Sequence, residues 1–158
     1  MDLLPEAFRR RDVLPVGRLD KDTTGLLLVT NDGELAHRLL SPARHVWKEY
    51  VAEVDGALQP ADVDAFAAGM ALTDFVAMPA ELQILETTPD SARAIVRVRE
   101  GKFHQVKRMF HARGREVLQL HRQTFGPLRL TLAAPGDWRF LTAEEIAALR
   151  AAAQGNLT

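Results

Sequence analysis

The sequence predicts a single domain of the α+β class, and three observations support this prediction. The chain has 158 residues, a length that suits one domain with a hydrophobic core, and 47% of the residues are apolar. Segments with the alternating pattern of strands are interspersed with segments of helical periodicity. Two strand-like segments, 80–86 and 92–99, are separated only by a turn. We therefore expect one α+β domain spanning residues 1–158.

The first part of the chain is predicted to place a polar loop ahead of a buried strand. Residues 1–11 are interpreted as a short helix or an irregular lead-in. The apolar run Leu26–Val29 is too short for a helix and is bounded by turn residues, which favours a strand. The segment Asp20–Gly25 forms the loop before it, and Gly25 can adopt backbone angles that suit a sharp turn.

Four segments are predicted as helices, and local signals mark their ends. Asn31 or Asp32 can cap the first helix, Pro60 suits the first turn of the second, and Thr142 with Glu145 forms a capping box for the last. The predicted helices are 34–40, 60–68, 103–113 and 143–153. The residues expected to face the core are Leu35, Leu39, Leu40, Val63, Phe66 or Ala67, Phe103, Val106, Phe110, Ile146, Leu149 and Ala153.

The remaining strands are predicted from alternation of side chains. Residues 47–54 place Trp47 and every second residue on one side, and Lys48, Tyr50 and the next alternate residues on the other. Ala94 and its alternate neighbours form one face of 92–99, with arginines on the opposite face. Further strands are expected at 117–121 and 128–132, and the pattern in 71–79 is ambiguous.

Charge is distributed unevenly, although the formal net charge is only −1. Residues 49–90 contain nine acidic residues and no Lys or Arg, whereas residues 102–122 contain six Lys or Arg, three His and one acid. Such asymmetry can create a positive face for a phosphate backbone. Equally, the cations can coat a solvated helix, and the residues alone leave both interpretations open.

Several classes of protein are excluded or disfavoured by the sequence. The chain has no cysteine, so it has neither disulfides nor thiolate zinc sites. The glycine-rich phosphate motifs and the G-x-S-x-G elbow are absent, and His104 and His111 lack further metal ligands. We therefore expect no cofactor and no metal. No apolar run is long enough to span a membrane and no signal peptide is evident, so cytoplasmic residence is the default.

Three interpretations of the Asp20 loop remain open on the residues alone. It can be an ordinary charged turn, or a loop that holds a catalytic carboxylate against a buried strand. It also matches four places of a twelve-residue calcium motif, with Asp20, Asp22, Thr24 and Gly25. The ninth and twelfth places hold Leu28 and Asn31, so two expected calcium ligands are missing. Tyr50, the only tyrosine, is either a half-buried strand residue or an aromatic wall for a base.

Three segments together resemble the motifs of the RNA pseudouridine synthase family. Gly17-Arg18-Leu19-Asp20, followed by Thr23 or Thr24, Gly25 and Leu26, resembles the first motif. Lys48-x-Tyr50 is similar to the second, and the run from Gly101 to Phe110 is similar to the third. The motifs occur in the family's order, and the resemblance spans 4–149. Residues 37–42 and 120–122 most resemble the bacterial small-subunit branch, which modifies one uridine in 16S rRNA, of the position-516 type. Synthases acting on 23S rRNA are the alternative.

The resemblance implies a fold, a site and a set of roles. The fold is a mixed, mainly antiparallel sheet flanked by helices, with a central RNA-binding cleft. Asp20 is the implied catalytic residue, Tyr50 packs against the flipped uracil, and Lys107 pairs with Asp20. Arg18 fills the gap that the flipped nucleotide leaves in the RNA. The full set of implied RNA-binding residues is Arg18, Lys102, His104, Gln105, Arg108, Arg115, His121 and Arg122.

The sequence departs from the family pattern at its N-terminal end. Family members usually begin with an S4-type RNA-binding domain and a strand with a Lys-Pro-x-Gly signature, and both are missing here. We therefore expect 1–158 to be a catalytic domain without its first strand, from a misassigned start or a fragment. The expected partner is ribosomal RNA within a small-subunit assembly intermediate, bound by a monomer. The rival interpretation is a catalytically inert RNA-binding fragment.

Overall fold

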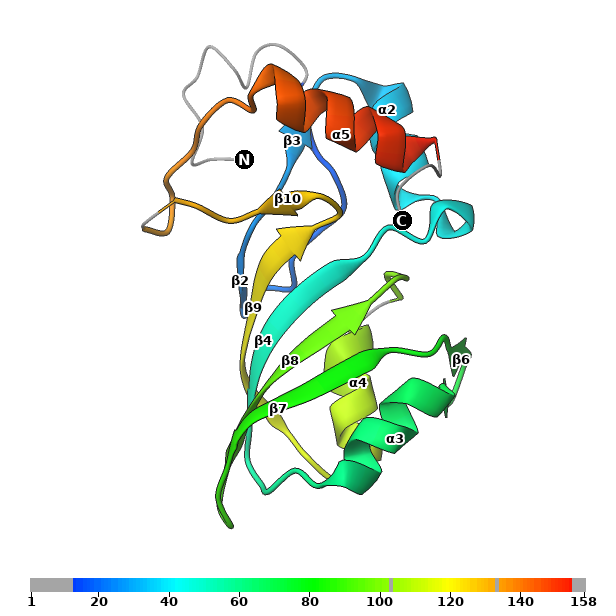
Figure 1. The fold of residues 1–158 in the computed structure, drawn as a ribbon, viewed down its shortest axis with the longest axis vertical. Helices are drawn as coiled ribbons and strands as arrows, with labels where there is room; N and C mark the ends of the chain where they lie inside the picture. Colours follow the sequence, from blue (N-terminus) through cyan, green and yellow to red (C-terminus); the bar gives the residue numbers. More distant parts are fainter. Residues whose placement is uncertain (1–12, 103, 133, 155–158) are drawn as a thin grey trace.

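The computed structural model describes residues 13–102, 104–132 and 134–154. The predictions for residues 1–11 and for Phe103 lie outside the described residues. The described part is an α+β fold, as predicted, with one large sheet and helices packed at both of its ends (Figure 1).

The large sheet is mixed and mainly antiparallel, which confirms the predicted type. Its strands run in the order β10-β9-β4-β8-β7 with every neighbour antiparallel, and β2 adds to β9 in parallel. The strands are β2 Thr23–Gly25, β4 Lys48–Val54, β7 Glu81–Thr87, β8 Ala92–Val98, β9 Val117–Phe125 and β10 Leu128–Arg129. Two short ribbons complete the fold, β1 Leu14–Pro15 with β3 Val29–Thr30 and β5 Met70–Ala71 with β6 Val76–Ala77. The last ribbon occupies the segment whose pattern was ambiguous.

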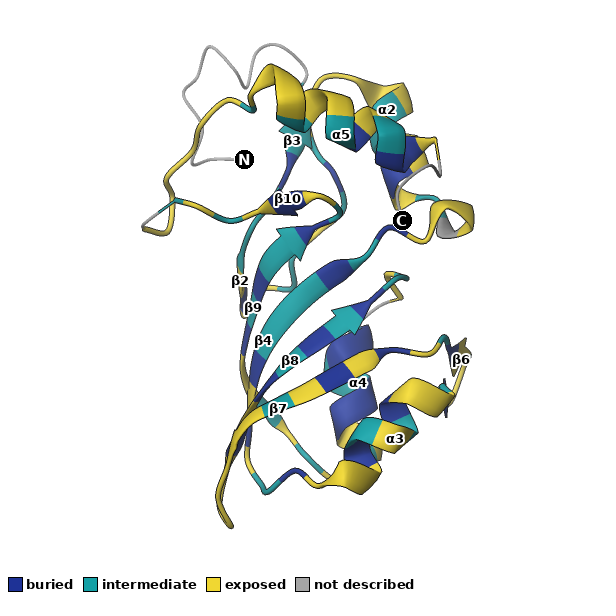
Figure 2. Ribbon diagram, viewed as in Figure 1, coloured by how far each residue is buried: buried dark blue, intermediate teal, exposed yellow. Residues whose placement is uncertain are grey.

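The helices pack into two hydrophobic clusters at opposite ends of the sheet. The helices are α2 Gly33–Leu40, α3 Pro60–Ala68, α4 Gln105–Ala112 and α5 Ala143–Ala153, and a 3-10 turn spans Pro42–Arg44. Helices α3 and α4 cover the sheet beside β4, β7 and β8, and four of the eight residues of α4 are buried (Figure 2). Helices α2 and α5 pack on each other with Phe125 and Leu128 in the second cluster. Among the described residues, no helix has the length and apolarity needed to cross a membrane.

The helix ends follow the local signals, but two core predictions are wrong. Asp32 caps α2 by accepting from the Leu35 amide, and Thr142 with Glu145 forms the predicted capping box. Leu40 remains 45% exposed and Ile146 38% exposed. Leu40 is one residue beyond Leu39, so it lies about 100° around the helix from that buried side chain. Ile146 is in the first turn of α5, whereas the buried residues of this helix all lie in its second half.

Candidate active site

The Asp20 loop connects β1 to β2 and is fixed by its pairing with β9. The Thr23 amide donates to the Asp20 carbonyl at 2.9 Å, which closes a tight turn. Gly25 pairs with Arg122 in the parallel ladder and has a φ of +117°. A Cβ at Gly25 would lie 2.1 Å from the Arg122 carbonyl oxygen. Glycine is therefore required here, because β2 approaches β9 too closely for any side chain.

The predicted strand Leu26–Val29 is wrong as a continuous strand, because the chain changes partners within it. The Leu26 amide donates to the Arg122 carbonyl at 2.8 Å, so this end belongs with β9. Val29 instead pairs with Pro15, and Leu28 accepts from the Val16 amide at 2.7 Å. Leu28 is buried, as predicted. The exchange ties the Asp20 loop to the large sheet at one end and to the β1–β3 ribbon at the other.

Helix α4 and its N-cap residue bring two basic side chains to the carboxylate of Asp20. The Lys107 Nζ lies 3.7 Å from Oδ2, and the His104 Nε2 lies 3.4 Å from Oδ1. The Asp20 side chain is 26% exposed, so it is held by protein groups yet accessible from solvent. Val16, four residues before Asp20, belongs to one hydrophobic cluster, and Val106, next to Lys107, belongs to the other. The site therefore lies where the two halves of the fold meet.

Tyr50 is connected to the Asp20 loop through strand pairing in the large sheet. It pairs with Arg122 on β9 and with Val96 on β8, and Arg122 pairs in turn with Gly25. Its ring packs partly buried against the cluster that contains Val96. Within the described part of the chain, the Tyr50 hydroxyl makes no hydrogen bond. Tyr50 thus lies on β4, which is separated by β9 from β2, the strand that follows the Asp20 loop.

The predicted RNA-binding residues separate into exposed and internal groups. Arg18 and Lys102 are exposed, and His121 bonds with the Thr24 hydroxyl at 2.8 Å beside the loop. Arg108 pairs with Asp74 and stacks over Phe75, with its guanidinium carbon 5.2 Å from the ring centroid.

Three members of the predicted set are tied to the protein instead. Gln105 is buried and bonds to the turn before α4. Arg115 lies beyond the far end of α4, where it donates to the Ala57 carbonyl at 2.7 Å. Arg122 is only 3% exposed and donates from Nε to the Leu26 carbonyl at 2.9 Å. The burial of Arg122 differs from the exposed phosphate contact that we expected and favours a role in bracing the loop.

Lys48, the first residue of the second motif, is buried close to the turn that precedes α4, and the sequence assigned it no role in the site. It is 8% exposed, and its Nζ lies 5.5 Å from the Phe125 ring centroid, on which Arg122 also packs. Burial, and then repulsion by Arg122, lower the pKa of Lys48 from 10.5 to about 8, against the attraction of Glu100. The Nη2 of Arg122 is buried with no hydrogen-bond partner among the described residues. The only sequence signal for Lys48 was its place two residues before Tyr50.

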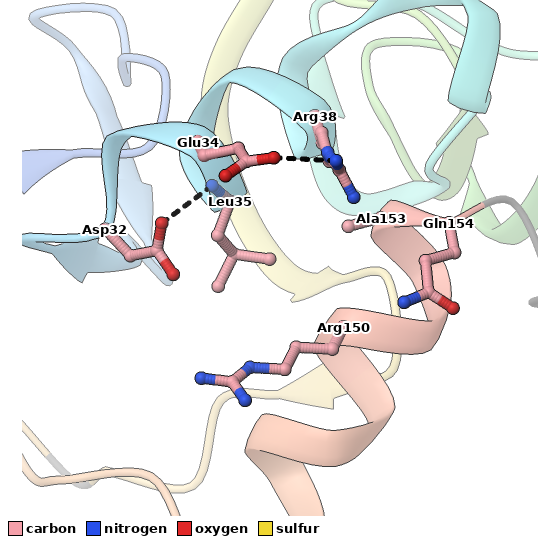
Figure 3. A pocket seen from close by; sticks show the side chains of 7 residues that line it. All are labelled: Asp32, Glu34, Leu35, Arg38, Arg150, Ala153 and Gln154. Atoms are coloured by element: carbon pink, nitrogen blue, oxygen red, sulfur yellow. Dashed lines mark hydrogen bonds and ion pairs between the residues drawn. The ribbon is translucent and has the colours of Figure 1, made fainter.

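Two hollows in the surface lie away from Asp20. One, of about 160 Å³, lies between α2 and α5, and Figure 3 shows Arg150 extending from α5 across it. The other, of about 190 Å³, is lined by ends of β4, β7 and β8. The Asp20 carboxylate is reached from the open surface, and the central RNA-binding cleft stays a prediction. The described residues hold no group of three His, Cys, Asp or Glu side chains placed to share a metal ion.

Comparison with known proteins identifies relatives along most of the chain. Residues 2–112 match the RNA pseudouridylate synthase family. The uncharacterized RNA pseudouridine synthase YtzG of Bacillus subtilis is 43% identical over 150 residues, covering 92% of this chain and 62% of its own length. Ribosomal small subunit pseudouridine synthase A of Pseudomonas aeruginosa is 44% identical over 149 residues, covering 92% and 63%. The enzyme of the same name from Escherichia coli is 42% identical over 136 residues, covering 84% and 57%.

Solved structures agree with these matches. A crystal structure of a pseudouridylate synthase superimposes with a TM-score of 0.87 at 35% identity, covering 94% of this chain and 64% of that one. Human RNA pseudouridylate synthase domain containing 1 shares the fold, with a TM-score of 0.58 at 18% identity, covering 91% and 82%. The chain spans 57% to 63% of the length of the curated relatives named above. It belongs to the RNA pseudouridylate synthase family, as its three motifs predicted.

Proposed function

We propose that this chain isomerises a uridine of ribosomal RNA to pseudouridine, with Asp20 as the catalytic carboxylate. The observation that carries the proposal is the Asp20 side chain itself. It is a partly exposed carboxylate on a loop fixed at both ends, and each of its oxygens faces a basic group from α4 or its N-cap. Membership of the RNA pseudouridylate synthase family supplies the reaction that such a carboxylate would serve.

The reaction is an isomerisation, so its atoms balance within the nucleotide. The N1–C1′ bond breaks, the uracil ring turns, and a C5–C1′ bond forms. The proton leaves C5 and N1 gains one, with no net oxidation or reduction. A carboxylate can serve this reaction as a nucleophile or as a base at the sugar. The nucleotide must first be flipped out of the folded RNA, at a cost of a few kcal/mol.

The neighbouring residues are assigned supporting roles in the same proposal. Tyr50 would stack on the flipped uracil, an interaction worth about 1–3 kcal/mol per base. Lys107 would hold Asp20 through their ion pair. Arg18 would fill the space that the flipped nucleotide leaves, and its exposed position beside the loop allows this. Lys102 would contact phosphates, since it is exposed at the same end of α4.

The proposed substrate is 16S rRNA within a small-subunit assembly intermediate, modified at the position-516 type of site by a monomer in the cytoplasm. Support comes from the relatives of Pseudomonas aeruginosa and Escherichia coli, both named as synthases of the ribosomal small subunit. Mass-spectrometric mapping of pseudouridine would test this after incubation with 16S rRNA, 23S rRNA and the intermediate. One modified uridine in 16S rRNA is expected. Product in 23S rRNA alone would contradict the choice of substrate.

The role of Asp20 is tested by Asp20→Asn, with Asp22→Asn as the matched control on the same loop. Tritium release from RNA carrying 5-tritiated uridine is expected to fall by about 10³-fold or more for Asp20→Asn, because the substitution removes the reacting group but keeps its shape. RNA binding should be unchanged or slightly tighter, since one negative charge is lost. Asp22 is exposed, so Asp22→Asn should retain activity.

Two results would overturn the proposal. Retained turnover in Asp20→Asn would remove this carboxylate from the mechanism. RNA binding by the unaltered chain without product on any of the RNAs would make the chain an inert RNA-binding module.

A further inference from the structure

His104 has an unfavourable backbone conformation at the edge of the site. Its φ of 51° and ψ of 34° are left-handed, and it is the N-cap of α4 without a capping hydrogen bond from its side chain. Residues other than glycine rarely adopt this conformation, and they keep it where the surrounding structure enforces it. His104 therefore calls for an explanation that its helix-capping position does not supply.

The turn before α4 enforces this conformation through Gln105. The Gln105 side chain is 5% exposed, and its Oε1 accepts from the Lys102 amide at 3.2 Å. Its backbone amide donates to the Lys102 carbonyl at 3.0 Å, and its Nε2 donates to Glu100 at 2.9 Å. Glu100 in turn accepts from the Met78 amide at 2.6 Å, which anchors the turn to the rest of the fold. These bonds of Gln105 to Lys102 and Glu100 hold the backbone around His104, so His104 has little freedom to move to a more favourable backbone conformation.

The enforced conformation directs the imidazole toward Asp20. Its Nε2 lies 3.4 Å from Oδ1, while the Lys107 Nζ lies 3.7 Å from Oδ2. The two partners differ in stiffness, because lysine carries its charge on a flexible four-carbon chain and histidine carries a rigid ring with few rotatable bonds. An ammonium group alone can follow the carboxylate through many orientations. The ring, fixed by its backbone, restricts the orientation of Asp20.

We propose that His104 is a positioning residue that holds Oδ1 of Asp20, leaving the carboxylate in the one orientation that suits attack on the nucleotide. This proposal rests on the proposed function of Asp20. It also replaces the expected RNA contact of His104 with a different role, and the two roles predict different kinetics. A positioning residue changes kcat, whereas an RNA contact changes the affinity for RNA.

His104→Gly separates the side chain from the backbone strain. Glycine adopts left-handed angles freely, so the variant should fold with at least the stability of the unaltered chain. Its kcat is expected to fall about 10- to 100-fold, because small misplacements of a reacting group carry losses of this size. The Kd for RNA should change less than twofold, and added imidazole should restore part of the kcat. His104→Asn keeps a hydrogen-bond donor, and asparagine tolerates the same backbone conformation. Its kcat should therefore lie between those of the unaltered chain and His104→Gly.

His45→Gly is the matched control. His45 has a φ of 49° and is exposed, and among the described residues the ion pairs of Asp20 are with His104 and Lys107, so replacing His45 relieves the same strain away from the site. A second readout does not depend on turnover. The ¹³Cγ resonance of Asp20, assigned by its loss in Asp20→Asn, should shift in His104→Gly and stay in place in His45→Gly.

The outcomes distinguish this inference from the proposed function. Unchanged kcat in His104→Gly together with an inactive Asp20→Asn would overturn the inference alone. Unchanged kcat with a raised Kd would assign His104 to RNA binding. An Asp20 resonance that does not move in His104→Gly would overturn the inference whatever the activity. Equal turnover by Asp20→Asn and the unaltered chain would overturn the proposed function, and the resonance would then decide whether His104 still orients this carboxylate.

Discussion

Lys48→Met is expected to stabilise the protein at neutral pH, which is the reverse of the usual effect of a core substitution. Burial and the neighbouring Arg122 lower the pKa of Lys48 from 10.5 to about 8. The pKa difference is about 2.5 units, and each unit corresponds to about 1.36 kcal/mol. At a pH where Lys48 is protonated in both the folded and the unfolded state, its charge therefore lowers the free energy of unfolding by about 3 kcal/mol. Methionine has a similar length and carries no charge, so it removes this cost while filling the same space.

The pH dependence follows from the sign of the change. Between pH 8 and 10.5 the unfolded chain keeps the Lys48 proton and the folded chain does not, so the free energy of unfolding of the unaltered protein rises with pH in this window. The gap between Lys48→Met and the unaltered protein should therefore shrink from about 3 kcal/mol at pH 7 to about 1 kcal/mol at pH 10.

Urea unfolding at the two pH values measures this gap, with Lys21→Met as the control because Lys21 is exposed. A destabilised Lys48→Met at pH 7, or a gap that does not change with pH, would refute the reasoning.

Two further substitutions test how the fold is held. Asp62→Ala should lower the free energy of unfolding by about 2 kcal/mol, because the buried carboxylate accepts from Arg113 Nε at 2.8 Å and from the Gln59 amide at the α3 N-terminus. Asp64 is exposed on the same helix, so Asp64→Ala should change the free energy of unfolding by less than about 0.5 kcal/mol in the same urea experiment. Gly25→Ala should lower the stability measured by thermal unfolding by about 3 kcal/mol or more, because the new Cβ would lie 2.1 Å from a backbone oxygen of β9. In the control Gly33→Ala, the new Cβ would meet no atom within 4 Å, so this substitution should be neutral or stabilising. Equal effects of the two substitutions would contradict the close approach of β2 to β9.

Features encoded by neighbouring residues were predictable from the sequence. The cap at Asp32 and the capping box of Thr142 with Glu145 each depend on residues within one helical turn, so they can be predicted without knowing the tertiary contacts. The resemblance to the family then predicted that Asp20 and Lys107 would come together, and they lie 3.7 Å apart. Periodicity alone could not have paired them, because it contains no information about which distant segments touch.

Pairing between distant segments was not predictable, and it altered two expectations. The run Leu26–Val29 appeared as one strand because its residues are uniformly apolar, yet its two ends pair with different partners. The uneven charge along the chain suggested a positive face, but folding places acids of one segment against cations of the other. Arg113 pairs with Asp62 across 51 residues, for example. Part of the expected positive face is therefore neutralised within the protein.

Lys48 shares the Glu100 carboxylate with the turn that precedes α4 and His104. Glu100 attracts Lys48, and the same carboxylate accepts from Gln105 Nε2 at 2.9 Å. A Cβ at Gly101 would lie 3.8 Å from the Lys48 Nζ, so the ammonium group sits directly beneath this turn. Strand β4 is thereby connected through Glu100 and Gln105 to His104, and from there to Asp20.

Each link in this chain of contacts is partly or fully buried, and interactions between charged or polar groups are stronger there than in water. A lysine that lowers stability in isolation can therefore still fix the geometry of the loop carboxylate. The second motif would then contribute to the site twice, since Tyr50 presents its ring and Lys48, two residues earlier on β4, supports the turn that orients Asp20.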